Sequence, residues 1–411
     1  RRVQAARDVD ITALSAGNAN ASTEAYGGAI VSGAGSHATS IVDHKAKVQL
    51  YGNLHANRHL TVESKISDAV EAHADTKSYG SVDANALSNT RIAQSFTSVI
   101  DVDQGARLSA GDSIELNAYT YLDDMMTSNT HSGALFGTSK ANQESGSGIH
   151  IGDPDNASTT EINISRAHLL ADEIYLNSRV LGIDTAPENA NGEVVVAFGG
   201  GMQNANQATA RVDVTETTLI NINNNAKLVG DRVEITATQQ NLNLHTRSHT
   251  RRGRAASKSE AGIDYTGTSQ ITSSAGATVV TENLTVQADQ FIDDGDIKAV
   301  ADSERGHFDP TYDLKSDREI EWNATVLGRR RATLDVDADG TIVEAEGLVV
   351  QPYRYVDGNY TFEEAQTHAE SLGGQLVTIR SAAEQQLLEE FIATQPGTDD
   401  FWIGASDEGH E

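Results

Sequence analysis

A six-residue alternating pattern, first seen as Asp8-Val9-Asp10-Ile11-Thr12-Ala13, decides the fold of this chain. Its second and fourth positions are branched aliphatic residues, its sixth is Ala or Ser, and the positions between them are mainly polar. A period of two residues places the aliphatic side chains on one face of a β-strand and the polar ones on the other. We call these segments marker strands; the other copies are His59-Leu60-Thr61-Val62-Glu63-Ser64, Ser113-Ile114-Glu115-Leu116-Asn117-Ala118, Glu173-Ile174-Tyr175-Leu176-Asn177-Ser178, Arg232-Val233-Glu234-Ile235-Thr236-Ala237 and Asn283-Leu284-Thr285-Val286-Gln287-Ala288.

The marker strands define an internal repeat. Intervals between their second aliphatic residues run from 51 residues (Ile11 to Val62) to 60 residues (Leu116 to Leu176). Two further elements precede a marker strand, so each unit holds at least three short strands. One is an Ala-x-aliphatic segment, with copies Ala46-Lys47-Val48, Ala106-Arg107-Leu108, Ala167-His168-Leu169, Ala226-Lys227-Leu228 and Ala277-Thr278-Val279; the other is an alternating strand such as Ile100-Asp101-Val102, Ile162-Asn163-Ile164 and Ile220-Asn221-Ile222.

The rest of each unit is rich in Ala, Gly, Ser and Thr, which is poor material for an ordinary globular core. A narrow stack of units needs only a few inward apolar residues from each. We therefore predict a mainly β protein, in which six degenerate repeats over residues 1–318 form a parallel β-helix (a solenoid). A unit of this length has room for two or three rungs. A β-sandwich array is the structural alternative.

These repeats resemble those of very large bacterial filamentous adhesins and haemagglutinin-like proteins. The resemblance is carried by segments such as 34–39 (AGSHAT) and 105–116 (GARLSAGDSIEL) and covers residues 1–318. It implies an extended stalk on or outside a bacterial cell. The chain begins with Arg1 inside a repeat, so we expect it to be an excerpt of a longer, exported protein.

The composition limits the kinds of partner and the chemistry that are expected of the protein. The chain has 59 acidic and 30 basic residues, for a formal charge of −29, and it has no cysteine. Such a charge disfavours nucleic acid, and the absence of cysteine removes disulfides and thiol catalysis. We expect a secreted or cell-surface location, no membrane span in this fragment, and no nucleic-acid partner.

Residues 319–350 are interpreted as a β-hairpin junction that contains a candidate calcium loop. Residues 335–346 match the twelve-residue calcium pattern, with a glycine at its sixth position. Calcium is the only cofactor that the sequence suggests. Strand-favouring residues flank the loop where an EF-hand needs helices, so a hairpin turning at Asp339-Gly340 is the favoured interpretation. The calcium candidates are Asp335, Asp337, Asp339, Thr341 and Glu346.

Aromatic residues and helical periodicity return from residue 351. Thr361 and Glu364 form a capping box that predicts a helix ended by Gly373, and Ser381 with Glu384 predicts a second helix. The order of elements resembles the N-terminal half of a C-type-lectin-like domain over residues 351–411. The matching segments are 360–365 (YTFEEA), 369–379 (AESLGGQLVTI) and 401–407 (FWIGASD). In that family the sugar and calcium ligands lie beyond this last segment, so none is assigned here.

The resulting hypothesis is a non-enzymatic adhesion protein, in which a β-solenoid stalk presents a lectin-like module to glycans or cell-surface proteins. A β-helix polysaccharide lyase or hydrolase with an accessory lectin-like domain is the first alternative. It requires acidic or basic residues converging on one rung face. No such cluster is evident in the sequence, and histidines such as His37, His44, His55 and His59 are interpreted as surface residues. A purely structural stalk is the other alternative.

Overall fold

The computed structural model describes residues 2–336 except 104, 137, 144–146, 154, 156, 186–194, 201–202, 252–256, 291–296, 304–305 and 329–330. It also describes residues 356, 360–372 and 376–377. In these residues the protein is mainly β, as predicted, with one helix, α1 (Phe362–Ser371). The strands form two sheets, one of seven strands and one of sixteen.

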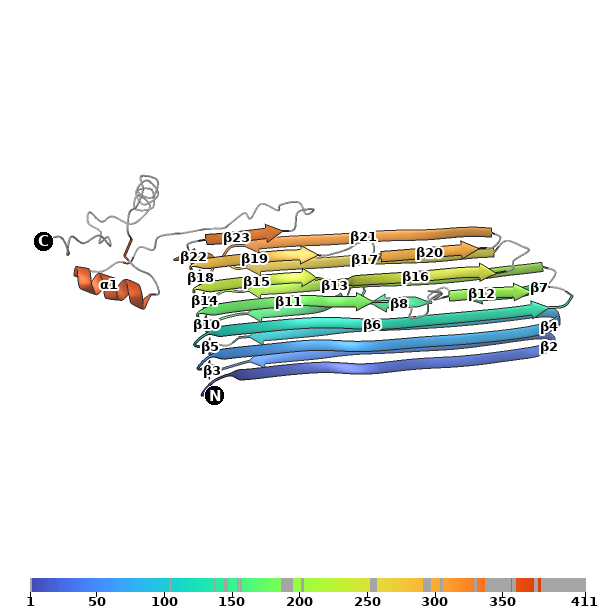
Figure 1. Ribbon diagram of the computed structural model, residues 1–411, viewed down its shortest axis with the longest axis horizontal. Coiled ribbons are helices and arrows are strands. Elements are labelled where there is room, and N and C mark those ends of the chain that lie inside the picture. The colour runs from blue at the N-terminus through green and yellow to red at the C-terminus, as the bar shows by residue number, and fades with distance from the viewer. Residues whose placement is uncertain are drawn as a thin grey trace.

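The larger sheet contains the long strands. These run across most of the width of the molecule and lie one above another (Figure 1). Its strands are β2 (Val9–Leu50), β4 (His59–Val102), β6 (Ser113–Ala134), β7 (Thr138–Gln143), β8 (Gly148–Ile151), β9 (Ser158–Ile164), β11 (Glu173–Asp184), β12 (Val195–Gly200), β13 (Gln203–Ile222), β15 (Arg232–Gln239), β16 (Leu242–Arg251), β17 (Ser257–Ser273), β19 (Asn283–Gln290), β20 (Ile297–Ser303), β21 (Gly306–Trp322) and β23 (Arg331–Val336).

The marker strands stack in register, so one repeat unit makes one layer. Val9 pairs with Leu60, Leu60 with Ile114, and Ile114 with Ile174; the same column continues through β15 and β19. The prediction of two or three rungs per repeat unit is therefore wrong. Every pairing among the described strands is parallel, which also excludes the alternative of an antiparallel sandwich.

Each layer consists of two long arms joined by a turn. We call residues from the marker strand to the turn the outgoing arm, and the residues that run back the return arm. In the first layer the turn lies near Gly27, where an added Cβ would come within 2.8 Å of the Gly33 carbonyl oxygen. In the second it lies at Gly80, where a Cβ would collide with the Asp83 backbone. Glycine is needed at both positions because the two arms approach so closely.

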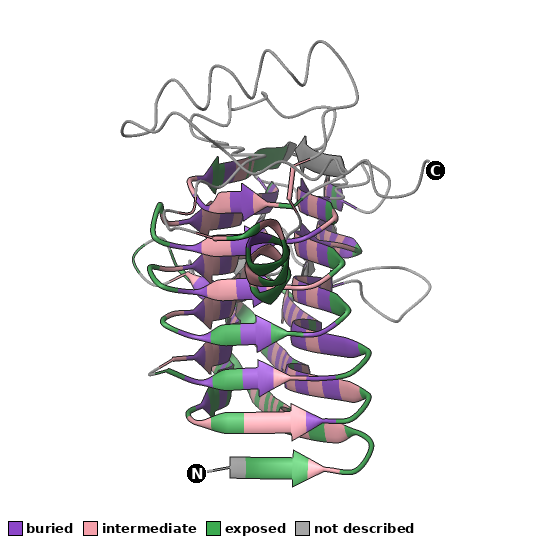
Figure 2. Cartoon of the chain, turned by 90° about the vertical axis from the view of Figure 1, so that its left-hand side faces the viewer, coloured by how far each residue is buried: buried purple, intermediate pink, exposed green. Residues whose placement is uncertain are grey.

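The smaller sheet closes the opposite end of the layers. Its short strands pair in parallel and form a column that faces the viewer in Figure 2. The strands are β1 (Arg2–Ala5), β3 (Asn53–Ala56), β5 (Arg107–Ser109), β10 (His168–Leu170), β14 (Lys227–Val229), β18 (Thr278–Val280) and β22 (Thr325–Leu327).

This sheet corrects one repeat assignment. The last four predicted Ala-x-aliphatic copies supply four of its seven strands, and Leu108, Leu169 and Leu228 stack in one column. The partner of Leu108 in the first layer is Leu54, not Val48. Ala46-Lys47-Val48 instead belongs to the return arm and pairs with residues 98–100. The misassignment arose because Ala-x-aliphatic is short enough to occur by chance in an alanine-rich arm.

The repeat pairing continues past residue 318. Residues 319–322 complete β21, β22 joins the short-strand column, and β23 pairs with the sixth marker strand through Leu334 and Val286. Residues 331–336 therefore form a seventh marker-like strand in a segment interpreted from sequence as a hairpin junction. The proposed turn at Asp339-Gly340 lies outside the described residues.

The interior changes character along the arms. Near the short strands, buried Leu, Ile and Val from adjacent layers make one continuous cluster, which includes Leu60, Leu116, Ile100 and Leu108. Farther out, a second cluster mixes Ile66, Leu122, Phe96 and other apolar groups with small residues. Toward the turns, the inward positions are mainly Ser, Thr and Ala. Each buried hydroxyl there needs a hydrogen-bond partner.

Helix α1 confirms the predicted capping box. The Thr361 side chain accepts a hydrogen bond from the Glu364 backbone amide, and the Glu364 carboxylate accepts one from the Thr361 amide. Ala365 is buried, and the helix ends at Ser371 with Leu372 as its C-cap. The predicted second helix and the strand at Phe401-Trp402-Ile403 lie outside the described residues.

Candidate functional sites

The predicted calcium residues are described only in part. Asp335 lies in strand β23, where it pairs with Gln287. A strand therefore precedes the loop at the point where an EF-hand requires a helix. Asp337, Asp339, Thr341 and Glu346 lie outside the described residues. Within the described parts of the chain, no three His, Asp or Glu side chains are grouped in a way that could hold a metal ion.

A groove of about 530 Å³ lies on the outer face of the second, third and fourth layers, near the corner with the short strands. Strands β4, β6 and β11 and the two turns that precede β6 and β11 supply its walls. Because a marker strand alternates, its polar positions face outward here and stack across layers. The lining residues are His59, Asp112, Ser113, Glu115, Asp172, Glu173, Tyr175 and Asn177.

The groove is strongly acidic. Asp112 and Asp172 occupy equivalent turns of neighbouring layers, and the Glu173 amide donates to the Asp112 carbonyl at 2.9 Å. Layers in such a sheet lie about 4.8 Å apart, so the two turns are close neighbours. His59, in the marker strand of the preceding layer, lies beside these groups. Its Nε2 is 3.7 Å from an Asp112 carboxylate oxygen, and its Nδ1 is 3.0 Å from the Ser113 hydroxyl.

Tyr175 gives the groove an aromatic wall. Its hydroxyl donates to Glu173 at 2.8 Å, and the Arg232 guanidinium lies 5.9 Å from the centre of its ring. Burial, followed by the hydrogen bond to Glu173, raises the pKa of Tyr175 to about 12. The phenol therefore stays protonated at physiological pH. The groove can hold hydroxyl-rich or cationic ligands through carboxylate acceptors and one aromatic face.

The groove was not predicted from the sequence, although several of its lining residues belong to the predicted marker strands. Glu115 and Tyr175 are 60 positions apart, yet they are direct register partners. The available signal was the marker-strand alignment itself, because aligned copies place equivalent outward residues side by side. Several acidic residues of these strands and turns therefore lie together on one outer face.

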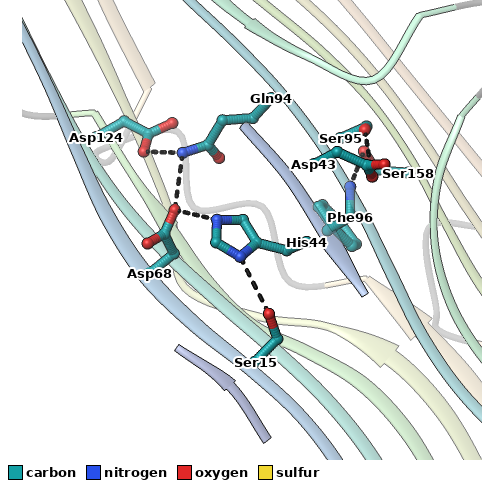
Figure 3. A network of polar contacts seen from close by, with 9 residues as sticks. All are labelled: Ser15, Asp43, His44, Asp68, Gln94, Ser95, Phe96, Asp124 and Ser158. Atoms are coloured by element: carbon teal, nitrogen blue, oxygen red, sulfur yellow. Dashed lines mark hydrogen bonds and ion pairs between the residues drawn. The ribbon is translucent and has the colours of Figure 1, made fainter. Parts of the chain in front are cut away.

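A second site is a chain of polar side chains inside the first three layers (Figure 3). Ser15 and His44 come from the two arms of the first layer, Asp68 and Gln94 from those of the second, and Asp124 from the third. The Ser15 hydroxyl lies 3.2 Å from His44 Nδ1, and His44 Nε2 lies 2.6 Å from Asp68. The Gln94 amide then donates to Asp68 at 3.3 Å and to Asp124 at 2.8 Å.

This network corrects the interpretation of His44 as a surface residue. Its exposed fraction is 8 %, against 5 % for Asp68 and Gln94 and 0 % for Asp124. A hydroxyl, an imidazole and a carboxylate that contact one another in that order are the parts of a nucleophilic catalytic centre. Here they lie between packed arms, where they hold the arms and successive layers together. Burial, followed by the charge of Asp68, raises the pKa of Asp124 well above its usual value, which favours a protonated carboxyl.

A third polar cluster lies between the arms farther along the stack, among strands β13, β15, β17 and β19. Tyr265 Oη is 2.8 Å from Glu216 and 3.0 Å from the Gln239 side-chain oxygen, and the Gln290 amide donates to the same phenol. Glu216 is 1 % exposed, and burial raises its pKa to about 7. The hydrogen bond from Tyr265 opposes that shift. Close to neutral pH, this carboxyl therefore exchanges between its protonated and charged forms.

Comparison with known proteins does not place the chain in a family. No family model, no curated protein and no solved structure matches it. Among the described residues, no helix is long and apolar enough to cross a membrane.

Proposed function

We propose that this protein is a non-enzymatic binding or adhesion protein of the bacterial cell surface or exterior. In this proposal the stacked units form a β-solenoid stalk that presents a lectin-like module to glycans or surface proteins. The observation that carries the proposal is the pairing of one repeat unit per layer, in register, along the whole described stack. Such a structure lengthens simply by adding units, because each layer contacts only its neighbours.

The outer surface supports a role in a solvent-exposed stalk. On the return arms, outward polar side chains from successive layers bond to one another. Asn163 donates to Asp101 at 3.1 Å, Asn221 donates to Asn163 at 2.9 Å, and Thr272 donates to Asn221 at 2.6 Å. This ladder satisfies the amide groups between layers while leaving the sheet face polar.

The lectin-like part of the proposal rests on family resemblance over residues 351–411 and on the capped helix α1, which has the predicted start. The test is to produce the chain extended past residue 411 and to measure glycan binding on an array with calcium and with a chelator. Calcium-dependent binding supports the proposal. If neither glycans nor purified surface proteins bind the extended chain, the adhesion function is wrong and a structural stalk remains.

Calcium binding by the 335–346 segment needs a separate measurement. If the loop holds the ion, calcium should raise the melting temperature of the 411-residue chain, and the double variant Asp337→Asn/Asp339→Asn should abolish that rise. Equal melting temperatures with calcium and with chelator would remove these residues as ligands.

A polysaccharide lyase or hydrolase is the second candidate, and the acidic groove is the observation that favours it. Glu115, Asp172 and Glu173 place several carboxylates along one wall of the groove, and paired carboxylates are the usual machinery of glycoside cleavage. Incubation with acidic and neutral polysaccharides, followed by assay of new reducing ends, tests this candidate. An activity that Glu115→Gln and Glu173→Gln both remove would replace the non-enzymatic proposal.

A further inference from the structure

A ridge of exposed apolar side chains runs along the turns of the first three layers. These turns lie at the end of the arms farthest from the short strands and from the acidic groove. The ridge breaks the polar pattern of the outer faces, and contiguous apolar groups of this kind mark interaction surfaces on soluble proteins. Its members are Tyr26, Ile30, Val31, Tyr79, Val82, Leu135 and Phe136, with exposed fractions from 44 % to 72 %.

The ridge contains a groove of about 430 Å³, within the size range of small-molecule sites. Most of its lining residues are small, and Tyr79 and Leu135 are the two large side chains among them. The lining residues are Ala29, Tyr79, Gly80, Ser81, Gly133, Ala134 and Leu135.

Register places glycines on both sides of Tyr79. Its partner in the layer below is Gly28 and its partner in the layer above is Gly133. A Cβ added at Gly28 would meet no atom within 4 Å, so the space beside the tyrosine is open. An aromatic side chain 56 % exposed and flanked by glycines presents its ring to a ligand instead of packing against neighbouring side chains.

The turns that carry this groove are held together by backbone hydrogen bonds. The Leu135 amide donates to the Gly80 carbonyl at 3.3 Å, and the Phe136 amide donates to the Ser81 carbonyl at 2.9 Å. The groove is therefore formed before a ligand arrives, which lowers the entropic cost of binding.

Charge limits what this surface accepts. The whole chain carries a formal charge of −29, which opposes association with anionic surfaces and with a second copy of itself. Lys77, beside the ridge, is bonded to Asp75 at 2.8 Å and lies 5.3 Å from the centre of the Tyr26 ring. Tyr26 Oη in turn donates to Glu24 at 3.2 Å. The net charge therefore disfavours anionic ligands, while the exposed Tyr79 ring suits a ligand with a flat apolar face.

We propose that the turn ridge binds a neutral oligosaccharide, with one sugar ring stacked on Tyr79 between Gly28 and Gly133. The C–H face of a sugar matches the exposed tyrosine ring, and its hydroxyls can bond to the polar groups of the turn backbone. This site is separate from the lectin-like module of the proposed function.

The test uses the 411-residue chain and soluble neutral hexasaccharides of glucose, mannose and galactose, with polygalacturonate fragments as the acidic comparison. Binding is measured by calorimetry. We expect neutral sugars to bind, and Tyr79→Ala to weaken that binding up to about tenfold. Gly28→Leu should block the site while leaving the tyrosine in place, because its side chain enters open space.

Tyr51→Ala is the matched control, since Tyr51 is 52 % exposed and lies off the ridge. It should bind like the unmodified chain, and circular dichroism should show the same fold for all variants. Three results overturn the proposal: no binding of any neutral sugar, binding unchanged in Tyr79→Ala and Gly28→Leu, or binding of lipid vesicles or self-association through the ridge in place of sugar. Sugar binding that survives both variants moves the site elsewhere and leaves the adhesion proposal standing.

Discussion

The two ends of each layer solve the same packing problem with different chemistry. Next to the short strands, the arms are joined by stacked Leu, Ile and Val such as Leu60, Ile114 and Leu116, all fully buried. Toward the turns, they are joined by hydroxyls: Ser88 Oγ lies 2.6 Å from Ser128 Oγ and 2.8 Å from Thr130 Oγ1. This difference indicates that burial of apolar side chains next to the short strands (the apolar end) drives assembly of the stack. Toward the turns (the hydroxyl end), where few apolar side chains are available, hydrogen bonds between hydroxyls keep the two arms paired.

The largest expected effect comes from the apolar end. Leu116→Ala removes a fully buried side chain that stacks between Val62 and Leu176. Because the neighbouring layers are held by their own pairing and cannot fully close the cavity, we expect a loss of about 2–5 kcal/mol of unfolding free energy. Urea unfolding followed by circular dichroism measures it. A loss below that from a hydroxyl-end substitution would reverse the assignment of the two ends.

Between the two ends lie the buried ionisable groups, which make the comparison depend on pH. The folded protein raises the pKa of Glu216 from its ordinary value near 4.5 to about 7, so it binds the proton more tightly than the unfolded chain. The stability contribution of this group is fully present below pH 4.5. It is lost as pH rises through 7, because the folded state must then bury a charge.

Glu216→Gln should remove this loss. We expect the variant to be more stable than the unmodified chain at pH 8, by up to about 3 kcal/mol, and to show little difference at pH 4. The glutamine can still accept the hydrogen bond from Tyr265. Thermal unfolding of both proteins across pH 4–9 gives the measurement; parallel profiles over the whole range would mean that Glu216 does not titrate in the folded state.

The sequence predicted the apolar end far better than the rest. Leu60, Ile114 and their equivalents alternate with polar residues, so their face and their stacking could be read directly. On the hydroxyl end, inward Ser32 and Thr76 look like solvent-facing residues, and nothing in their pattern separates the two faces. For this reason the long arms, and the single layer per unit, were not predicted.

The candidate sites were less predictable still, because each joins different layers. His44 lies on an arm with little apolar contrast, so its burial beside Asp68 could not be inferred from its neighbours in sequence. Glu115 and Tyr175 belong to well-predicted strands, but their adjacency depends on register between units. A one-residue slip in that register would send the same side chains to the opposite face.

The smallest expected effect tests the hydroxyl end itself. Ser88→Ala deletes the hydroxyl that bridges Ser128 and Thr130 but removes no apolar volume. Thr130 and Ser128 then each lose one partner, so we expect destabilisation of about 1 kcal/mol, well below that of Leu116→Ala. The same urea titration measures it, and hydrogen exchange locates it: amides near residues 86–90 and 128–132 should exchange faster, while those of the marker strands keep their protection. If protection falls equally at both ends, the layer unfolds as one cooperative unit, and the division between a driving apolar end and a pairing hydroxyl end does not hold.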